Sequence, residues 1–169
     1  RAETADLALI YFAGHGIEVQ GENFLIPVDA QPTSNIEVQQ QSVSLKEMLQ
    51  VIEKARVMRI VILDSCRDNP LGGQIDTDAV AQSEQQSTDQ ATRGVGGLAP
   101  ANPDRGTLVA FAAKDGQVAL DGTQGNSPYA RALMEKMAKP GLEISLMFRQ
   151  VRDAVLRETR NLQEPYTYG

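Results

Sequence analysis

The sequence contains one cysteine and one histidine, and each of them follows a run of apolar residues. Cys66 comes after the stretch Ile60 to Leu63, separated from it by Asp64 and Ser65, and His15 comes after the stretch that begins at Leu7. An imidazole within reach of a thiol can take its proton, and the resulting thiolate is a strong nucleophile. These two residue types therefore point to a cysteine–histidine pair that performs nucleophilic catalysis.

The elements on either side explain how two residues about 50 positions apart can meet. The uninterrupted apolar run Ile60 to Leu63 predicts a strand that is buried on both faces, because a half-buried strand would alternate. The stretch Leu7 to Phe12 predicts a second such strand. Between them, Ser44 and Glu47 form a capping box that predicts a helix beginning at Leu45. Strand, helix and strand make a βαβ unit, whose parallel strands end at the same sheet edge.

The remaining segments complete an α/β prediction. Residues 17–26 predict a short antiparallel hairpin, and residues 28–42 lack a period and predict a loop. A third core strand is predicted at Thr107–Ala112. A helix is predicted from Ser127-Pro128 through Met137, with an inner face made of Ala130, Leu133, Met134 and Met137, and a last helix at about 143–160. No further strand is predicted for the tail after Gln163.

Two motifs of this chain resemble a known family. The stretches Tyr11-Phe12-Ala13-Gly14-His15-Gly16 and Asp64-Ser65-Cys66 resemble the catalytic histidine and cysteine motifs of the caspase fold, and more closely those of metacaspases and their bacterial relatives. The resemblance implies a three-layer αβα sandwich with a mainly parallel sheet. It also implies one catalytic domain over residues 1–169 that is shortened at both ends, with three of the family's six strands.

Further site residues follow from these motifs. The backbone N–H groups of Gly16 and Cys66 lie where a tetrahedral intermediate would place its negative charge, so we expect them to form the oxyanion hole. Asp64 projects on the same side of an extended chain as Cys66, and we expect it to form the charged floor of the substrate pocket. The alternative is that Asp64 caps a neighbouring loop. The resemblance implies a preference for arginine or lysine, with Ala13 standing where some metacaspases have serine.

The resulting hypothesis is a cysteine endopeptidase that cuts proteins or peptides after arginine or lysine. Two alternatives stay open at this stage. The first is a catalytically silent caspase-like module that binds a protein partner, and the second is a hydrolase of this fold with a different acyl substrate. A lone cysteine at the end of a strand is also compatible with a purely structural role as a small buried apolar residue.

The segment from Leu71 to Arg105 differs in composition from the rest of the chain. It is rich in Gln, Ser, Thr, Asp and Gly and poor in large apolar residues, which predicts a mobile excursion. Such a segment is a good protease substrate, and it starts shortly after Cys66. We therefore expect the enzyme to cut itself there, after Arg93 in the first place and after Arg105 in the second.

Several other classes of function are disfavoured. One cysteine and one histidine are too few for a structural zinc site, and no second cysteine stands at Asn69 for a redox motif, so the sequence requires no metal or cofactor. Metacaspases often need calcium, which the resemblance adds as an open alternative, but the acidic residues around Asp29 and Asp68 do not assemble about six to eight oxygen ligands.

Charge and composition give the outer limits. A net charge of −6 argues against nucleic acid as a partner, and no apolar run is long enough to cross a membrane. The 169 residues, 41% of them hydrophobic, suit one domain with a real core. We therefore expect a soluble cytoplasmic or periplasmic protein, with the compartment and the oligomeric state left open.

Overall fold

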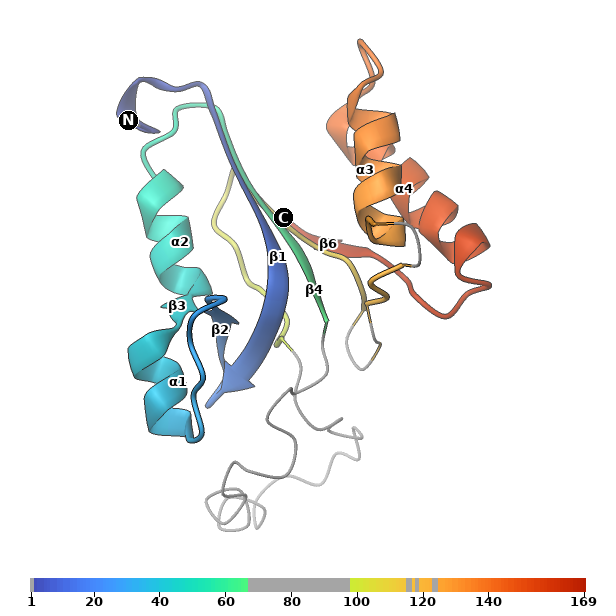
Figure 1. Ribbon diagram of the computed structural model, residues 1–169. Helices are drawn as coiled ribbons and strands as arrows, with labels where there is room; N and C mark the ends of the chain where they lie inside the picture. Colours follow the sequence, from blue (N-terminus) through green and yellow to red (C-terminus); the bar gives the residue numbers. More distant parts are fainter. Residues whose placement is uncertain (1, 67–97, 115–116, 118, 123–124) are drawn as a thin grey trace, which may run out of the picture.

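A six-stranded sheet runs through the middle of the molecule, with the strand order β3-β2-β1-β4-β5-β6 (Figure 1). The computed structural model describes residues 2–66, 98–114, 117, 119–122 and 125–169. The elements are a 3₁₀ helix η1 (Ala2–Thr4), strands β1 (Leu7–Val19), β2 (Glu22–Ile26), β3 (Val43–Ser44), β4 (Met58–Cys66), β5 (Thr107–Phe111) and β6 (Tyr166–Tyr168), and helices α1 (Asn35–Gln41), α2 (Leu45–Ile52), α3 (Pro128–Met137) and α4 (Ile144–Glu158).

The three strands in the centre of the sheet, β1, β4 and β5, are parallel to one another, as the sequence predicts. The outer pairs are antiparallel: β1 with β2, β2 with β3, and β5 with β6. The sheet is therefore mixed, with a parallel centre. Helices cover both faces, α1 and α2 on one side and α3 and α4 on the other (Figure 1), which gives the predicted three layers.

Strand β4 belongs to both halves of the core. Ile60 and Ile62 pack among the side chains of α3 and α4, whereas Val61 and Leu63 pack among those of α2. None of these four side chains is more than 2% exposed. Since adjacent strand residues point to opposite faces, a strand covered on both sides needs an unbroken apolar run, which is the pattern seen in the sequence.

The predicted starts of two helices are confirmed. At α2, Ser44 Oγ accepts a hydrogen bond from the N–H of Glu47 (3.1 Å), and Glu47 Oε2 accepts one from the N–H of Ser44 (3.0 Å). At α3, Ser127 is the N-cap residue and Pro128 occupies the first turn. Both caps satisfy N–H groups that have no partner inside the helix.

The sheet has six strands where the sequence predicts three. Outside the site, three further sequence predictions are wrong. Residues 28–42 are not all loop, because Ser34 caps the short helix α1, which buries only Val38 and so shows no apolar period. The tail does form a strand, β6, whose backbone pairs with β5. On α3 the inner face is Tyr129, Ala132 and Leu133, and the two methionines predicted to face inward are about half exposed.

The described residues contain no helix that is both long enough and apolar enough to span a membrane.

Gln163 links the tail to the loop that follows β5. Its side chain is completely buried; Oε1 accepts a hydrogen bond from the N–H of Leu120 (3.0 Å), and Nε2 donates one to the carbonyl of Ala112 (2.9 Å). A backbone group that loses its partner inside a protein costs about 1–3 kcal/mol. One side chain thus fixes both ends of the segment between Ala112 and Leu120.

We predict that Gln163→Leu lowers the free energy of unfolding by about 2 kcal/mol or more, because an apolar side chain of similar size leaves both backbone groups without a partner. Urea denaturation followed by circular dichroism measures this. The control is Gln50→Leu, which changes an exposed glutamine and should alter stability by no more than about 0.5 kcal/mol. Equal stability of the two variants would contradict the role given to Gln163.

Candidate active site

His15 and Cys66 are paired at the end of the β1–β4 ladder. The parallel register runs from Leu7 opposite Met58 to His15 opposite Cys66. Neighbouring strands lie about 4.8 Å apart, so residues at opposed positions are adjacent in space. The backbone thus brings together the two residues that the sequence singles out.

Strand β1 does not end at its histidine, whereas the sequence predicts that it ends at the same sheet edge as β4. It continues to Val19, and over residues 15–19 it pairs with β2. His15 therefore lies where the pairing of β1 with β4 ends and its pairing with β2 begins. The side chain of His15 is exposed. An exposed imidazole at the end of a ladder is accessible to a substrate.

Gly16 packs tightly against Leu98, which lies near the C-terminal end of the segment 71–105. A Cβ atom at this position would lie 2.8 Å from Cδ2 of Leu98, which is 1% exposed. The neighbouring Ala99 is held by Asn23: its N–H donates to Asn23 Oδ1 (2.5 Å), and Asn23 Nδ2 donates to its carbonyl (2.9 Å). Glycine at position 16 thus has a packing reason, in addition to its expected role as an oxyanion donor.

Asp64 is bound by two hydroxyl groups from different elements. Tyr11 Oη donates to Asp64 Oδ2 (2.8 Å), and Ser127 Oγ donates to the same oxygen (2.5 Å). These hydrogen bonds join β4 to β1 and to the start of α3, and neither involves a loop backbone. The loop-capping alternative for Asp64 therefore finds no hydrogen bond to support it among the described residues.

The pKa of Asp64 is raised above its ordinary value, mainly because the carboxyl is partly removed from water. The hydrogen bonds from Ser127 and Tyr11 act in the opposite direction, and the nearby negative charge of Asp121 adds to the increase. The pKa of Tyr11 is also raised, first by burial and then by its hydrogen bond to Asp64 and by the charge of Asp64. Tyr11 thus keeps its proton and acts as a donor.

Two residues of the helical layer surround the same carboxyl group. Ser127 Oγ accepts the N–H of Ala130 (2.8 Å) while it donates to Asp64, so the N-cap of α3 is also part of the site. Tyr129 is completely buried, and its hydroxyl has no partner among the described residues. Burial raises its pKa, and the negative charge of Asp64 raises it further.

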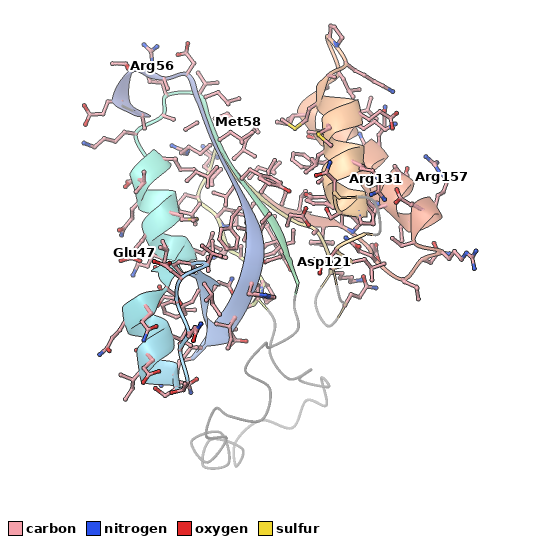
Figure 2. All side chains as sticks on the ribbon, viewed as in Figure 1. Glu47, Arg56, Met58, Asp121, Arg131 and Arg157 are labelled. Carbon is pink, nitrogen blue, oxygen red and sulfur yellow. The ribbon has the colours of Figure 1, made fainter. Side chains whose placement is uncertain are left out.

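The loop between β5 and α3 contributes Asp121. Figure 2 shows Asp121 near the carboxyl end of β4, and its charge acts on Asp64. Sequence reasoning missed Tyr11, Ser127 and Asp121 as site residues. Tyr11 had a usable signal, since it alternates with Ala13 and His15 along one strand and so shares their face. Ser127 gave only the signal of a helix cap.

The remaining predicted site residues are placed as follows. Ala13 is exposed and lies opposite Asp64 in the β1–β4 register. Arg105 is exposed, and its carbonyl accepts a hydrogen bond from Arg59 Nη2 (2.5 Å). Arg93 lies outside the described residues, as does most of the segment 71–105, although Leu98 and Ala99 at its end are anchored as described above.

No cluster of metal-binding side chains is found in the described parts of the chain. They contain no group of three or more His, Cys, Asp or Glu side chains that could hold a metal ion, so we assign no residues to the calcium that the resemblance left as an open alternative. A cavity of about 330 Å³ lies between α4 and β6, lined among others by Phe148, Arg149 and Tyr166. None of the predicted site residues lines it.

Comparisons with known proteins agree on the fold. A family model described as "Caspase domain" matches residues 1–169. Among solved structures, the chain is similar to the Drosophila initiator caspase Dronc (13% identity, TM-score 0.56, covering 99% of this chain and 54% of that one). It is also similar to caspase-1 from Spodoptera frugiperda (15%, 0.56, 99% and 61%) and to a protein from Geobacter sulfurreducens (15%, 0.52, 97% and 66%). No curated protein sequence matches it.

We predict that Asp64→Asn makes the protein more stable than the wild type at neutral pH. A carboxyl whose pKa is raised in the folded state holds its proton more tightly there than in the unfolded chain. Stability therefore falls as the pH rises from the ordinary Asp value, about 3.9, through the folded value. Asparagine keeps an oxygen that can accept from Tyr11 and Ser127 but does not ionise.

The measurement is the melting temperature of both proteins between about pH 3 and pH 7. The advantage of Asp64→Asn should be present at neutral pH and vanish at the acid end, where the wild-type carboxyl is protonated. Asp104→Asn, which changes an exposed aspartate in the turn before β5, is the control. A lower melting temperature for Asp64→Asn at pH 7 would show that the ionised carboxylate stabilises the fold.

Proposed function

This chain belongs to the caspase domain family, and on that premise we propose that it is a cysteine peptidase with His15 as general base and Cys66 as nucleophile. The observation that supports this most directly is the register of β1 and β4, which sets the only histidine of the sequence opposite its only cysteine. The chain spans between half and two thirds of the length of the solved caspase-fold structures named above. The peptidase activity is therefore proposed for the whole protein to which this chain belongs.

The proposed reaction has two steps. The imidazole of His15 takes the proton of the Cys66 thiol, and the thiolate attacks the carbonyl carbon of the peptide bond. The negative charge that develops on the carbonyl oxygen is stabilised by the N–H groups of Gly16 and Cys66. The C–N bond then breaks as the imidazolium protonates the leaving amine. Water, deprotonated by the same imidazole, hydrolyses the thioester and regenerates the thiol.

We propose further that the enzyme cuts after arginine or lysine. Asp64 supplies a partly buried carboxylate two residues before the nucleophile, and Asp121 adds a second negative charge nearby. A basic side chain would compensate the charge of Asp64, whereas an acidic one would bring a further negative charge into the same partly desolvated space. The proposed partners are proteins or peptides that present a basic residue in an extended segment.

We predict that Cys66→Ala and His15→Ala each lower kcat/KM by about 10⁴-fold or more, because the two residues act as one unit. The substrates are fluorogenic peptides that differ only in the residue before the cut: arginine, lysine, alanine or aspartate. The assay uses the full-length protein, with and without calcium. The wild type should cleave the arginine and lysine peptides and reject the aspartate peptide.

Ser65→Ala is the matched control, since it changes the residue beside Cys66 but on the other face of β4, where the buried hydroxyl has no partner among the described residues. It should stay active. Alkylation by iodoacetamide at about pH 6 tests the thiolate directly, and it should be fast in the wild type and slow in His15→Ala. A folded Cys66→Ala variant that still cleaves peptides would refute the mechanism. A folded wild type with a slow thiol and no turnover would favour a binding module instead.

We also propose that the enzyme processes itself after Arg93. The segment that contains Arg93 is polar and glycine-rich, and its attachment close to Cys66 gives it a high effective concentration at the site. Arg105 is less suitable, because the peptide bond that follows it is held in place: Arg59 Nη2 binds the carbonyl of Arg105, and the N–H of Arg59 binds the carbonyl of Gly106 (3.0 Å). A bond held in this way must be released before it can enter an active site.

Mass spectrometry of purified wild type and Cys66→Ala tests this proposal. We predict a cut after Arg93 in the wild type alone, and its loss in Arg93→Gln. Arg105→Gln is the control and should leave the cut unchanged. A cut that also appears in Cys66→Ala would assign the cleavage to another protease, and an active wild type that stays intact would rule out self-processing.

A further inference from the structure

The two hydroxyl groups that bind Asp64 reach the same carboxylate oxygen. Oδ2 accepts from Tyr11 and from Ser127, while Oδ1 accepts from no described residue. Each carboxylate oxygen has about two lone pairs available for hydrogen bonds. Oδ2 is therefore saturated within the protein, and Oδ1 is the oxygen left for a ligand.

The two donors differ in their surroundings. The hydrogen bond from Tyr11 is exposed, and the tyrosine side chain itself is 45% exposed. The hydrogen bond from Ser127 is partly buried at the start of α3, where the same hydroxyl also accepts the N–H of Ala130. Removal of the tyrosine hydroxyl would thus open a lone pair of Oδ2 toward the exposed side, whereas removal of the serine hydroxyl would open one toward the interior.

We propose that Tyr11 and Ser127 are positioning residues of the substrate pocket, which occupy Oδ2 of Asp64 so that the pocket recognises a basic side chain through Oδ1 alone. This inference rests on the proposed function and specifies its selectivity. The pocket can then make one hydrogen bond to a lysine ammonium through Oδ1. It cannot make the two parallel hydrogen bonds that the guanidinium of arginine forms with a free carboxylate.

The reason lies in the shapes of the two basic groups. A guanidinium binds a carboxylate best when two parallel N–H groups reach two different oxygens, and this geometry accounts for much of the advantage of arginine over lysine at such sites. An ammonium is compact and needs only one oxygen. With Oδ2 occupied, arginine loses one of its two hydrogen bonds, while lysine loses nothing.

Other groups around Asp64 influence its charge but do not occupy Oδ2. Asp121 in the loop before α3 and Tyr129 on α3 interact with it electrostatically, and His15 lies two residues beyond its β1 partner. Tyr11 and Ser127 are the described residues that donate to it. Both favour the ionised form of the carboxyl, so the loss of either should make Asp64 protonate at a higher pH.

The test compares wild type, Tyr11→Phe and Ser127→Ala on three peptides that differ only in the residue before the cut: arginine, lysine or norleucine, which has the four-carbon chain of lysine without its ammonium group. In Tyr11→Phe, the ratio of kcat/KM for arginine over lysine should rise about tenfold, the value of roughly one hydrogen bond to a charged group. In Ser127→Ala, this ratio should stay at the wild-type value.

The pH profile supplies a readout that a purely structural role would not move. The preference for lysine over norleucine requires an ionised Asp64, and the ratio of the two rates cancels the titration of His15 and Cys66. In both variants this preference should be lost at a higher pH than in the wild type. Tyr166→Phe, a tyrosine of similar exposure on β6, and Ser34→Ala, which removes the cap of α1, are the controls for folding and should match the wild type.

An unchanged arginine-to-lysine ratio in a folded Tyr11→Phe, or an unchanged pH profile in both variants, overturns the inference. The same series in the Cys66→Ala background, with binding of the N-acetyl amides of arginine, lysine and norleucine followed by NMR titration, separates it from the proposed function. If the basic amides bind selectively, and Tyr11→Phe and Ser127→Ala change this binding as described, the pocket inference is supported. If the wild type then shows no turnover of peptides, the proposed peptidase activity is refuted. Binding with no preference for the basic amides overturns the pocket inference itself.

Discussion

The parallel ladder between β1 and β4 is the constraint on which the rest of the site depends. Its register sets Ala13 opposite Asp64 and His15 opposite Cys66. Because side chains alternate along a strand, a slip of one residue would pair His15 with Ser65 and turn Tyr11 and Asp64 to opposite faces. The buried run Ile60 to Leu63, packed on both sides, fixes β4 against such a slip. The same apolar contacts that stabilise the core therefore set the geometry of the chemistry.

The parts of this fold that the sequence predicted are those with a local cause. The helix α2 begins where Ser44 and Glu47 can cap each other, and β4 contains an unbroken apolar run that is buried on both faces of the sheet. The juxtaposition of His15 and Cys66 followed from the rule that parallel strands end at one edge of a sheet. Family resemblance then supplied roles for these residues that patterns alone do not carry.

The parts that were missed depend on contacts between distant segments. β6 is a strand only because its backbone pairs with β5, and α1 has a single buried residue, Val38, from which no period can be inferred. The inner face of α3 is set by where the helix sits over β4 and β5, and this placed Tyr129 inside and Met134 outside. The hydroxyls of Tyr11 and Ser127 form hydrogen bonds with Asp64, which lies 53 and 63 positions away in the sequence. No local sequence pattern predicts such long-range hydrogen bonds.

The hydroxyl of Ser127 carries two roles, and this limits which amino acids can replace it. Serine, threonine, aspartate and asparagine all cap helices well. Aspartate at position 127 would set a second carboxylate against Asp64, and asparagine would have to accept the N–H of Ala130 and donate to Asp64 with two different atoms. Only a hydroxyl accepts and donates at a single oxygen. In variants of this chain that keep Asp64, substitution at position 127 is therefore restricted to serine and threonine, although a helix cap alone would tolerate twice as many residue types.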